Sequence, residues 1–176
     1  MWNRINLRPL DDVDKSLLNA LKTRLEQTFG CPVEVGKRIE LLKQAFVPER
    51  RQYHSSKLLG LLETAEDEAI LAVTEADLYA KGLNFVFGQA EPDAGAAVIS
   101  LKRLHDEYYG LPKNEALLGD RAAKEGIHEL GHVLGLGHCP DDHCVMFFSN
   151  TLADTDHKPA TFCIKCRMRL SKGSSK

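Results

Sequence analysis

The chain has 176 residues, of which 43% are hydrophobic and 27% are charged, and its formal net charge is −2. This length and composition are typical of one globular domain with a hydrophobic core of its own. The weak net charge gives no reason to expect a nucleic acid or an anionic membrane as a partner. Since we find no signal peptide and no apolar run of membrane-spanning length, we expect a cytoplasmic protein.

The first hundred residues alternate between short apolar runs and helical patterns. Residues 5–7 form a possible first strand. A helix is predicted over residues 12–29, where apolar side chains recur every four positions. Asp11 or Asp12 can cap the start of this helix, and Gly30 can end it.

Four more strands and a second helix are predicted before residue 102. We expect the helix at residues 53–63 and the strands at residues 32–35, 68–73, 84–88 and 96–101. Strands that alternate with helices favour an α/β sheet with parallel pairs. The link between the last two strands is too short for a parallel crossover, so these two strands should pair antiparallel.

The last third of the chain begins with a long predicted helix, at residues 115–135. Beyond it the helical periodicity fades, and Gly, Pro, Asp and Asn become frequent. Pro159 is expected to open a short final helix, and residues 171–176 resemble a loose basic tail.

The motif His128-Glu129-x-x-His132-x-x-Gly135-x-x-His138 carries the strongest chemical signal in the chain. In a helix, His128 and His132 lie one turn apart on the same face and can bind one metal ion. Gly135 can take a positive φ and end the helix, so that His138 completes a three-histidine site with an open position for water. Glu129 can then reach that water as a general base. Surface histidines on an ordinary helix are the alternative, which the added glycine and third histidine disfavour.

Four of the five cysteines lie in the last quarter of the chain as two close pairs, Cys139 with Cys144 and Cys163 with Cys166. An odd number of cysteines without a secretion signal argues against a disulfide framework. The pairs are typical of a closed structural zinc site with four thiolate ligands. A redox C-x-x-C pair would need a thioredoxin-like context, and a zinc ribbon for nucleic acid would need a more basic sequence. We expect Cys31 to be a buried free thiol.

From Ile127 to Cys166 the chain reads His-Glu-x-x-His-x-x-Gly-x-x-His-Cys-x4-Cys-x-Met and, after sixteen residues, Cys-x-x-Cys. This pattern closely resembles the archaemetzincins, a family of the metzincin clan of zinc metallopeptidases. The resemblance implies that Met146 is the Met-turn residue, an apolar floor beneath the zinc-binding histidines. Some other metzincins have a zinc-binding tyrosine two residues later, where this chain has Phe148.

The resemblance also implies the fold class, an α/β (α+β) fold of metzincin type. We expect a twisted five-stranded mixed sheet, an active-site helix and a small C-terminal subdomain below the cleft. Residues 84–88, which also resemble the family, would form the antiparallel edge strand along which an extended peptide binds. The chain would be a single metallopeptidase domain over residues 1–176, divided into subdomains at residues 1–137 and 138–176.

The sequence as a whole predicts a zinc-dependent peptidase with two zinc ions, one catalytic and one structural. Its partners would be peptide or protein substrates, with no nucleic acid and no membrane, and we expect a monomer. A catalytically silent zinc protein that binds peptides along its edge strand would share every metal ligand. Glu129 favours the enzyme, since zinc binding does not need it. A purely structural zinc module is disfavoured by the open three-histidine site.

Overall fold

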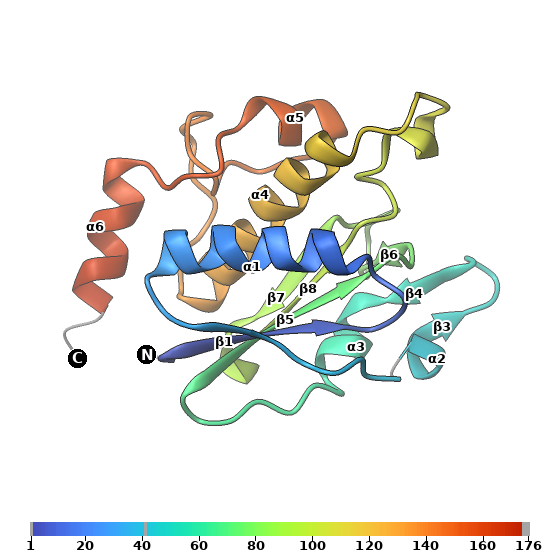
Figure 1. The fold of residues 1–176 in the computed structure, drawn as a ribbon, viewed down its shortest axis with the longest axis horizontal. Helices are drawn as coiled ribbons and strands as arrows, with labels where there is room; N and C mark the ends of the chain where they lie inside the picture. Colours follow the sequence, from blue (N-terminus) through green and yellow to red (C-terminus); the bar gives the residue numbers. More distant parts are fainter. Residues whose placement is uncertain (1, 41, 174–176) are drawn as a thin grey trace.

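In the computed structural model, which describes residues 2–40 and 42–173, five strands form one mixed sheet at the centre of the molecule (Figure 1). Their order is β2–β1–β5–β8–β7, and only β7 pairs antiparallel to its neighbour among these strands. The five strands are β1 (Arg4–Pro9), β2 (Val33–Val35), β5 (Glu68–Thr74), β7 (Gly88–Glu91) and β8 (Ala96–Ser100). The predicted five-stranded mixed sheet with an antiparallel edge is therefore confirmed.

The edge strand lies later in the chain than predicted. β7 begins at Gly88. Before it, Val86 forms an isolated bridge with Leu78, and the carbonyl of Phe87 accepts one hydrogen bond from Ser100 of β8. The side chains of Arg50 and Gln52 donate hydrogen bonds to the carbonyl of Asn84, which removes it from strand pairing. The aromatic and β-branched residues of this segment favour a strand locally. The backbone N–H of Val86 bonds the carbonyl of Leu78 in the second sheet, however, and so turns the segment away from β8.

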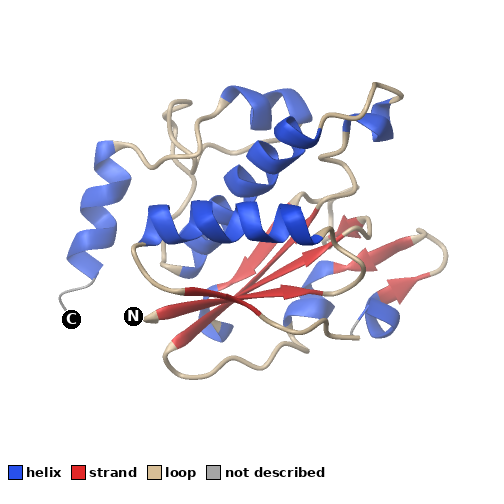
Figure 2. Cartoon of the chain, in the orientation of Figure 1, coloured by secondary structure: helices blue, strands red, loops and turns tan. Residues whose placement is uncertain are grey.

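Two long helices cover one face of the sheet (Figure 2). They are α1 (Lys15–Phe29) and α4 (Glu115–Val133). α1 ends at Gly30, which adopts the left-handed conformation at φ 66°, as predicted. Its start was predicted wrongly, because Asp14 is the cap and accepts from the N–H groups of Ser16 and Leu17. Asp11 instead accepts hydrogen bonds from Thr74 and Glu75 beside the sheet.

The predicted helix at residues 53–63 is wrong at both ends. Residues 52–54 form strand β4 (Gln52–His54), and only α3 (Ser55–Leu59) is helical. β4 belongs to a second, three-stranded sheet in the order β3–β4–β6, a feature that we did not predict. Its other strands are β3 (Phe46–Val47) and β6 (Leu78–Tyr79), and α2 (Leu42–Ala45) precedes it. Pairing with β6, distant in sequence, outweighs the local helical pattern.

The hydrophobic core lies on both faces of the central sheet. On the α1 and α4 face, alternate strand residues such as Leu71 and Ile99 are fully buried. On the opposite face, Ile70 and Val98 pack with Leu58 and other residues around α3. This alternation explains why β5 and β8 read as continuous apolar runs, since both faces of these parallel strands are covered. Of the described helices, none is long and apolar enough to cross a membrane.

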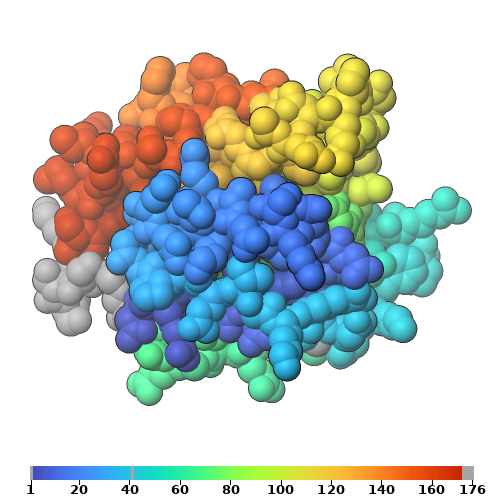
Figure 3. Space-filling model, viewed as in Figure 1, coloured from blue at the N-terminus to red at the C-terminus, as the bar shows by residue number. Residues whose placement is uncertain are grey.

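The C-terminal segment passes over α4 and then reaches one end of the molecule beside α1 (Figure 3). It contains α5 (Leu152–His157), which was not predicted although Thr151 and Asp154 form a capping box, and α6 (Ile164–Gly173). Pro159 does not open a helix. Proline disfavours helical backbone in the preceding residue, and Lys158 is extended with ψ 147°. The predicted basic tail is helical over residues 171–173, and residues 174–176 lie outside the described part.

Candidate metal centres

α4 carries the first half of the histidine motif across the sheet. His128 and His132 lie on one face, with their Nε2 atoms 3.0 Å apart. The helix ends at Val133, and Gly135 takes a φ of 83°, so the chain turns as the motif predicts. His138 then returns beside the pair, with its ring centroid 5.4 Å from that of His128 and 4.8 Å from that of His132.

Hydrogen bonds from Nδ1 orient two of the three imidazole rings. His128 Nδ1 lies 2.8 Å from the carbonyl of Val145, and His132 Nδ1 lies 2.7 Å from the carbonyl of Leu136. Because a carbonyl can only accept, each Nδ1 carries the proton and each Nε2 presents a lone pair. Two lone pairs facing each other at 3.0 Å repel unless a cation lies between them, so this geometry fits a metal ion.

The surroundings of all three imidazoles favour their neutral form. Desolvation lowers the pKa of His128 to about 2, and the positive charge of Lys158 acts in the same direction. The pKa values of His132 and His138 are also lowered, again mainly by burial. A neutral imidazole is the form that binds a metal, so these three side chains are ready to act as ligands.

Glu129 lies next to the histidines, against the edge strand. Its side chain is buried, and a Cβ atom built on Gly88 would lie only 2.7 Å from Glu129 Cγ and Oε1. Glycine at position 88 therefore leaves the space that Glu129 occupies. Burial raises the pKa of Glu129 well above its usual range, and the nearby carboxylate of Glu125 raises it further. Glu129 and the three histidines line one cleft of about 740 Å³.

Met146 is fully buried beneath the histidines. A Cβ atom on Gly131, in the turn of α4 between His128 and His132, would clash with the sulfur of Met146. The absence of a side chain at Gly131 thus lets the methionine approach the helix backbone. Met146 also accepts a backbone hydrogen bond from Cys139, which holds the residue after His138 in place.

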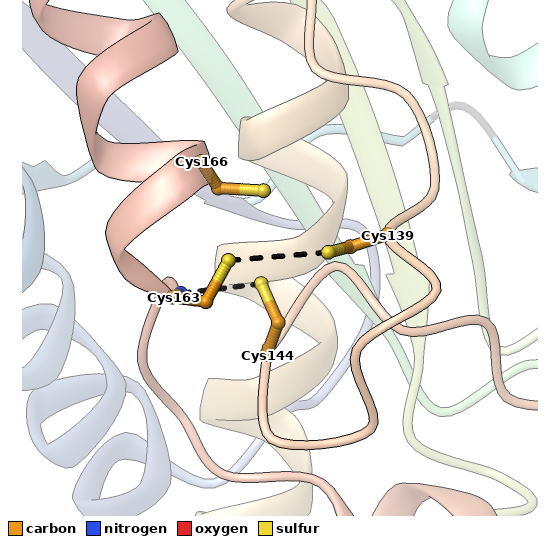
Figure 4. A group of neighbouring side chains, drawn as sticks. All are labelled: Cys139, Cys144, Cys163 and Cys166. Atoms are coloured by element: carbon orange, nitrogen blue, oxygen red, sulfur yellow. Dashed lines mark hydrogen bonds between the residues drawn. The ribbon is translucent and has the colours of Figure 1, made fainter.

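The four cysteines of the last quarter come together as one group (Figure 4). Cys139 and Cys144 lie on the loop after α4, Cys163 directly precedes α6 and Cys166 lies within it. All four sulfur atoms lie within 4.8 Å of one another, and no disulfide joins them. Cys31 is free and only half-buried, so it is less buried than predicted.

The environment of these thiols suits a thiolate metal site. The backbone N–H of Cys166 lowers the pKa of Cys163 to about 7. Burial raises the pKa of Cys144 and of Cys166, because a buried thiolate without a counter-charge is unfavourable. A divalent cation supplies that counter-charge, and four converging sulfurs match the tetrahedral ligand set that zinc prefers.

A buried ion pair next to the cleft was not predicted from the sequence. Lys158, whose side chain is fully buried, places Nζ 3.0 Å from Glu125 Oε1. The same carboxylate oxygen accepts from Thr155 Oγ1 at 3.1 Å, and Lys158 also donates to the carbonyl of Phe147 at 3.4 Å. The sequence does place Glu125 one turn before Glu129, and this spacing indicates that both carboxyl groups lie on one face of α4 near the cleft. His143, which lies between Cys139 and Cys144 in the sequence, is exposed and hydrogen-bonds Asp142.

This fold, with a buried glutamate beside a histidine triad and a separate cluster of four cysteines, defines a zinc metallopeptidase of the metzincin type. The family model described as Peptidase family M54 matches residues 10–172. The archaemetzincin of Methanocaldococcus jannaschii is 46% identical over 97% of this chain and 94% of its own length. The archaemetzincin of Pyrococcus furiosus is 40% identical, and the match covers 98% of this chain and 94% of the relative's own length. The chain therefore belongs to Peptidase family M54, the archaemetzincins, as the resemblance predicted.

Solved structures of relatives have the same fold. The crystal structure of archaemetzincin from Methanopyrus kandleri matches with a TM-score of 0.86 at 36% identity, and the match covers 99% of this chain and 97% of that one. The crystal structure of archaemetzincin from Archaeoglobus fulgidus, complexed with malonate, matches with a TM-score of 0.82 at 38% identity. This match covers 94% of this chain and 99% of that one. Membership in the family means that the chain is a zinc-dependent enzyme that acts on peptides or proteins.

Proposed function

We propose that the protein hydrolyses peptide bonds with one zinc ion held by His128, His132 and His138, and with Glu129 as the general base. The observation that carries this proposal is the placement of Glu129. Its carboxylate is buried in the same cleft as the histidines and contacts the edge strand at Gly88. A structural zinc site would need no carboxylate there.

The edge strand offers a place for an extended substrate. Ser100 donates a backbone hydrogen bond to Phe87, so this pair is hydrogen-bonded in the antiparallel ladder. Since hydrogen-bonded and non-hydrogen-bonded pairs alternate, Gly88 and Ala90 point their N–H and C=O groups away from β8. A peptide added as a further strand would pair with these groups, which bind it independently of its side chains.

The chemistry then divides between the metal and the protein. A zinc ion held by His128, His132 and His138 would supply Lewis-acid chemistry, which polarises a carbonyl and activates water. Glu129 accepts the proton of the attacking water on its carboxylate and passes it to the leaving amine. The hydrogen bonds from His128 to Val145 and from His132 to Leu136 hold the imidazoles in the tautomer that presents Nε2.

We propose that a second zinc ion, bound by Cys139, Cys144, Cys163 and Cys166, is structural. The group has four ligands and leaves no open position for a substrate or a water. Because His138 and Cys139 are neighbours in sequence, their side chains would bind different ions. The thiolate site would in this way fix the chain immediately after the third histidine.

The substitution Glu129→Gln tests the catalytic proposal. It removes the proton acceptor but leaves the three histidines unchanged, so we expect the turnover of a peptide to fall by about 10² or more. Zinc content, measured by elemental analysis, should stay at the parent value. Cleavage by Glu129→Gln at the parent rate would show that another group is the base. His132→Ala is the matched control, because it should lose both turnover and the zinc of the histidine site.

A further inference from the structure

Two large apolar side chains are exposed in the cleft. Leu83 is 51% exposed and Phe148 is 45% exposed, and both line the same cleft as the histidines. The ring of Phe148 lies 4.7 Å from that of His138. Phe85, Val86 and other apolar residues continue the lining. Exposed apolar surface of this kind, gathered in one cleft, marks a binding surface.

The segment that carries Leu83 is fixed by polar side chains from other elements. Arg50 donates to the carbonyls of Leu83 and Asn84, at 3.3 and 3.0 Å, and Gln52 donates to the carbonyl of Asn84 at 2.9 Å. The guanidinium of Arg103 lies 4.3 Å from the ring centroid of Phe85 and forms two hydrogen bonds with Asp77. This wall of the cleft is therefore preorganised and does not need a ligand to order it.

The residue before Phe148 is fixed in a similar way. The N–H of Phe147 donates to the carbonyl of Cys144 at 2.9 Å, and the carbonyl of Phe147 accepts from the buried Lys158 at 3.4 Å. Phe148 thus extends into the cleft from a residue whose N–H and carbonyl are both hydrogen-bonded. Two exposed apolar side chains on constrained segments are costly in water unless they have a partner.

Cations are missing from the lining of this cleft as far as the structure describes it. Apart from histidines, its ionisable side chains are Glu125 and Glu129. Lys158 lies behind Glu125, fully buried and paired with it, so it does not face the cleft. An acidic side chain placed against these lining residues would lose its hydration without gaining a cationic partner among them.

We infer that the cleft selects peptides with apolar side chains beside the scissile bond and discriminates against acidic ones, and that Leu83 and Phe148 set this preference. The inference rests on the proposed function, because it takes the histidine group as the place of cleavage. The backbone groups of Gly88 and Ala90 would bind any extended peptide, whereas the two apolar side chains would distinguish among sequences. The substrate class is thus an unfolded or flexible segment rich in apolar residues.

The experiment uses two peptides that differ only at the residues beside the cleaved bond, Leu in one and Asp in the other. Calorimetry with the zinc-loaded Glu129→Gln protein measures binding without hydrolysis, and kcat/KM is measured with the parent. We expect the Leu peptide to bind at least about tenfold more tightly and to be cleaved with a higher kcat/KM, since one apolar contact changes selectivity by about 10- to 200-fold. Equal affinities, or no measurable binding of either peptide, would overturn the inference.

Separate charge substitutions then test the two named residues. Phe148→Lys and Leu83→Lys each place a cation at one wall, so each should narrow the preference for the Leu peptide by improving binding of the Asp peptide. Leu111→Lys is the matched control, because Leu111 is 55% exposed but lies outside the cleft. Melting temperature and zinc content of each variant show that it is folded. An unchanged preference in both cleft variants would contradict the assignment of these residues.

The two measurements distinguish the inference from the proposed function. If the parent cleaves neither peptide but the binding preference is present, the catalytic proposal fails, and what stands of the inference is the preference of the cleft for apolar side chains. If the parent cleaves both peptides with equal kcat/KM and binds them equally, the catalytic proposal stands and the inference fails.

Discussion

Two glycines allow close contacts around the candidate catalytic side chains. Gly88 leaves space for Glu129 at the edge strand, and Gly131 leaves space for Met146 beneath the histidines. In each case the neighbour occupies the volume that a Cβ atom would need. Glycine in mid-helix costs up to about 1 kcal/mol relative to alanine, so the close approach of Met146 offsets a local loss of helix stability.

The Gly88→Ala variant should lose activity while it keeps its fold and its zinc. The new Cβ would lie 2.7 Å from Glu129 Cγ and Oε1, and the flexible carboxylate can move aside. A displaced base should lower kcat/KM by roughly tenfold to a hundredfold. Peptide cleavage and elemental analysis of the purified variant measure the two effects.

Gly119→Ala is the matched control on α4, where the new Cβ would meet only Leu17, at 3.8 Å. It should raise the free energy of unfolding by up to about 1 kcal/mol and leave kcat/KM unchanged. A Gly88→Ala protein that cleaves as fast as the Gly119→Ala protein would mean that Glu129 does not need its observed position.

At the scale of elements, the pair of Lys158 and Glu125 joins α4 to the end of α5 and to the turn that contains Met146. Both side chains are buried, and Thr155 and the carbonyl of Phe147 complete their hydrogen bonds. Such a pair is not strong evidence of net stabilisation, because removing two charges from water is costly. Lys158 and Glu125 nevertheless depend on each other, since either charge alone would be buried without an opposite charge.

Lys158→Met should therefore lower the free energy of unfolding by about 3–5 kcal/mol, because it leaves Glu125 buried and unpaired. The double variant Lys158→Met with Glu125→Leu should recover most of that loss. Denaturant unfolding of both variants gives the comparison. The control is Lys113→Met, whose pair with Glu115 is exposed, and which should melt with the parent. Equal losses in the single and double variants would show that packing, not charge pairing, is the role of Lys158.

At the scale of the whole molecule, the cysteine group joins the loop after α4 to α6. Cys163→Ser should lower the melting temperature strongly in zinc-replete buffer, because structural zinc contributes several kcal/mol of folding free energy. Loss of peptide cleavage should be the secondary effect, because without the second zinc Cys139 would no longer fix the position of His138. Cys31→Ser is the control, since Cys31 is free and lies outside both groups. A Cys163→Ser protein that melts with the parent would rule out a stabilising role for the site.

The two metal groups should also differ in their response to a chelator. His138 is exposed and His132 is half-buried, whereas three of the four cysteines are buried. A chelator should thus remove about one zinc per chain while the protein stays folded, and the second only with unfolding. Zinc analysis and melting curves along a chelator titration measure this order. Unfolding that accompanies loss of the first zinc would contradict it.

Local patterns predicted α1, α4 and the central strands well, because each has a regular apolar spacing and a clear terminal residue such as Gly30 or Gly135. The edge strand, α3 and the second sheet were placed wrongly or not predicted. Their positions depend on Arg50, Gln52 and β6, which act across long sequence separations. Pairing of that kind leaves no periodic signal in the segment itself.

The sequence by itself determined the family and named the seven candidate ligands, because the spacings within the histidine motif and within each cysteine pair are typical of metal sites. Only the tertiary structure decided what surrounds them. It placed Gly88 against Glu129, buried Lys158 behind Glu125 and left Leu83 and Phe148 exposed in the cleft. These contacts join residues from different elements, so they depend on how the elements pack and not on any local pattern.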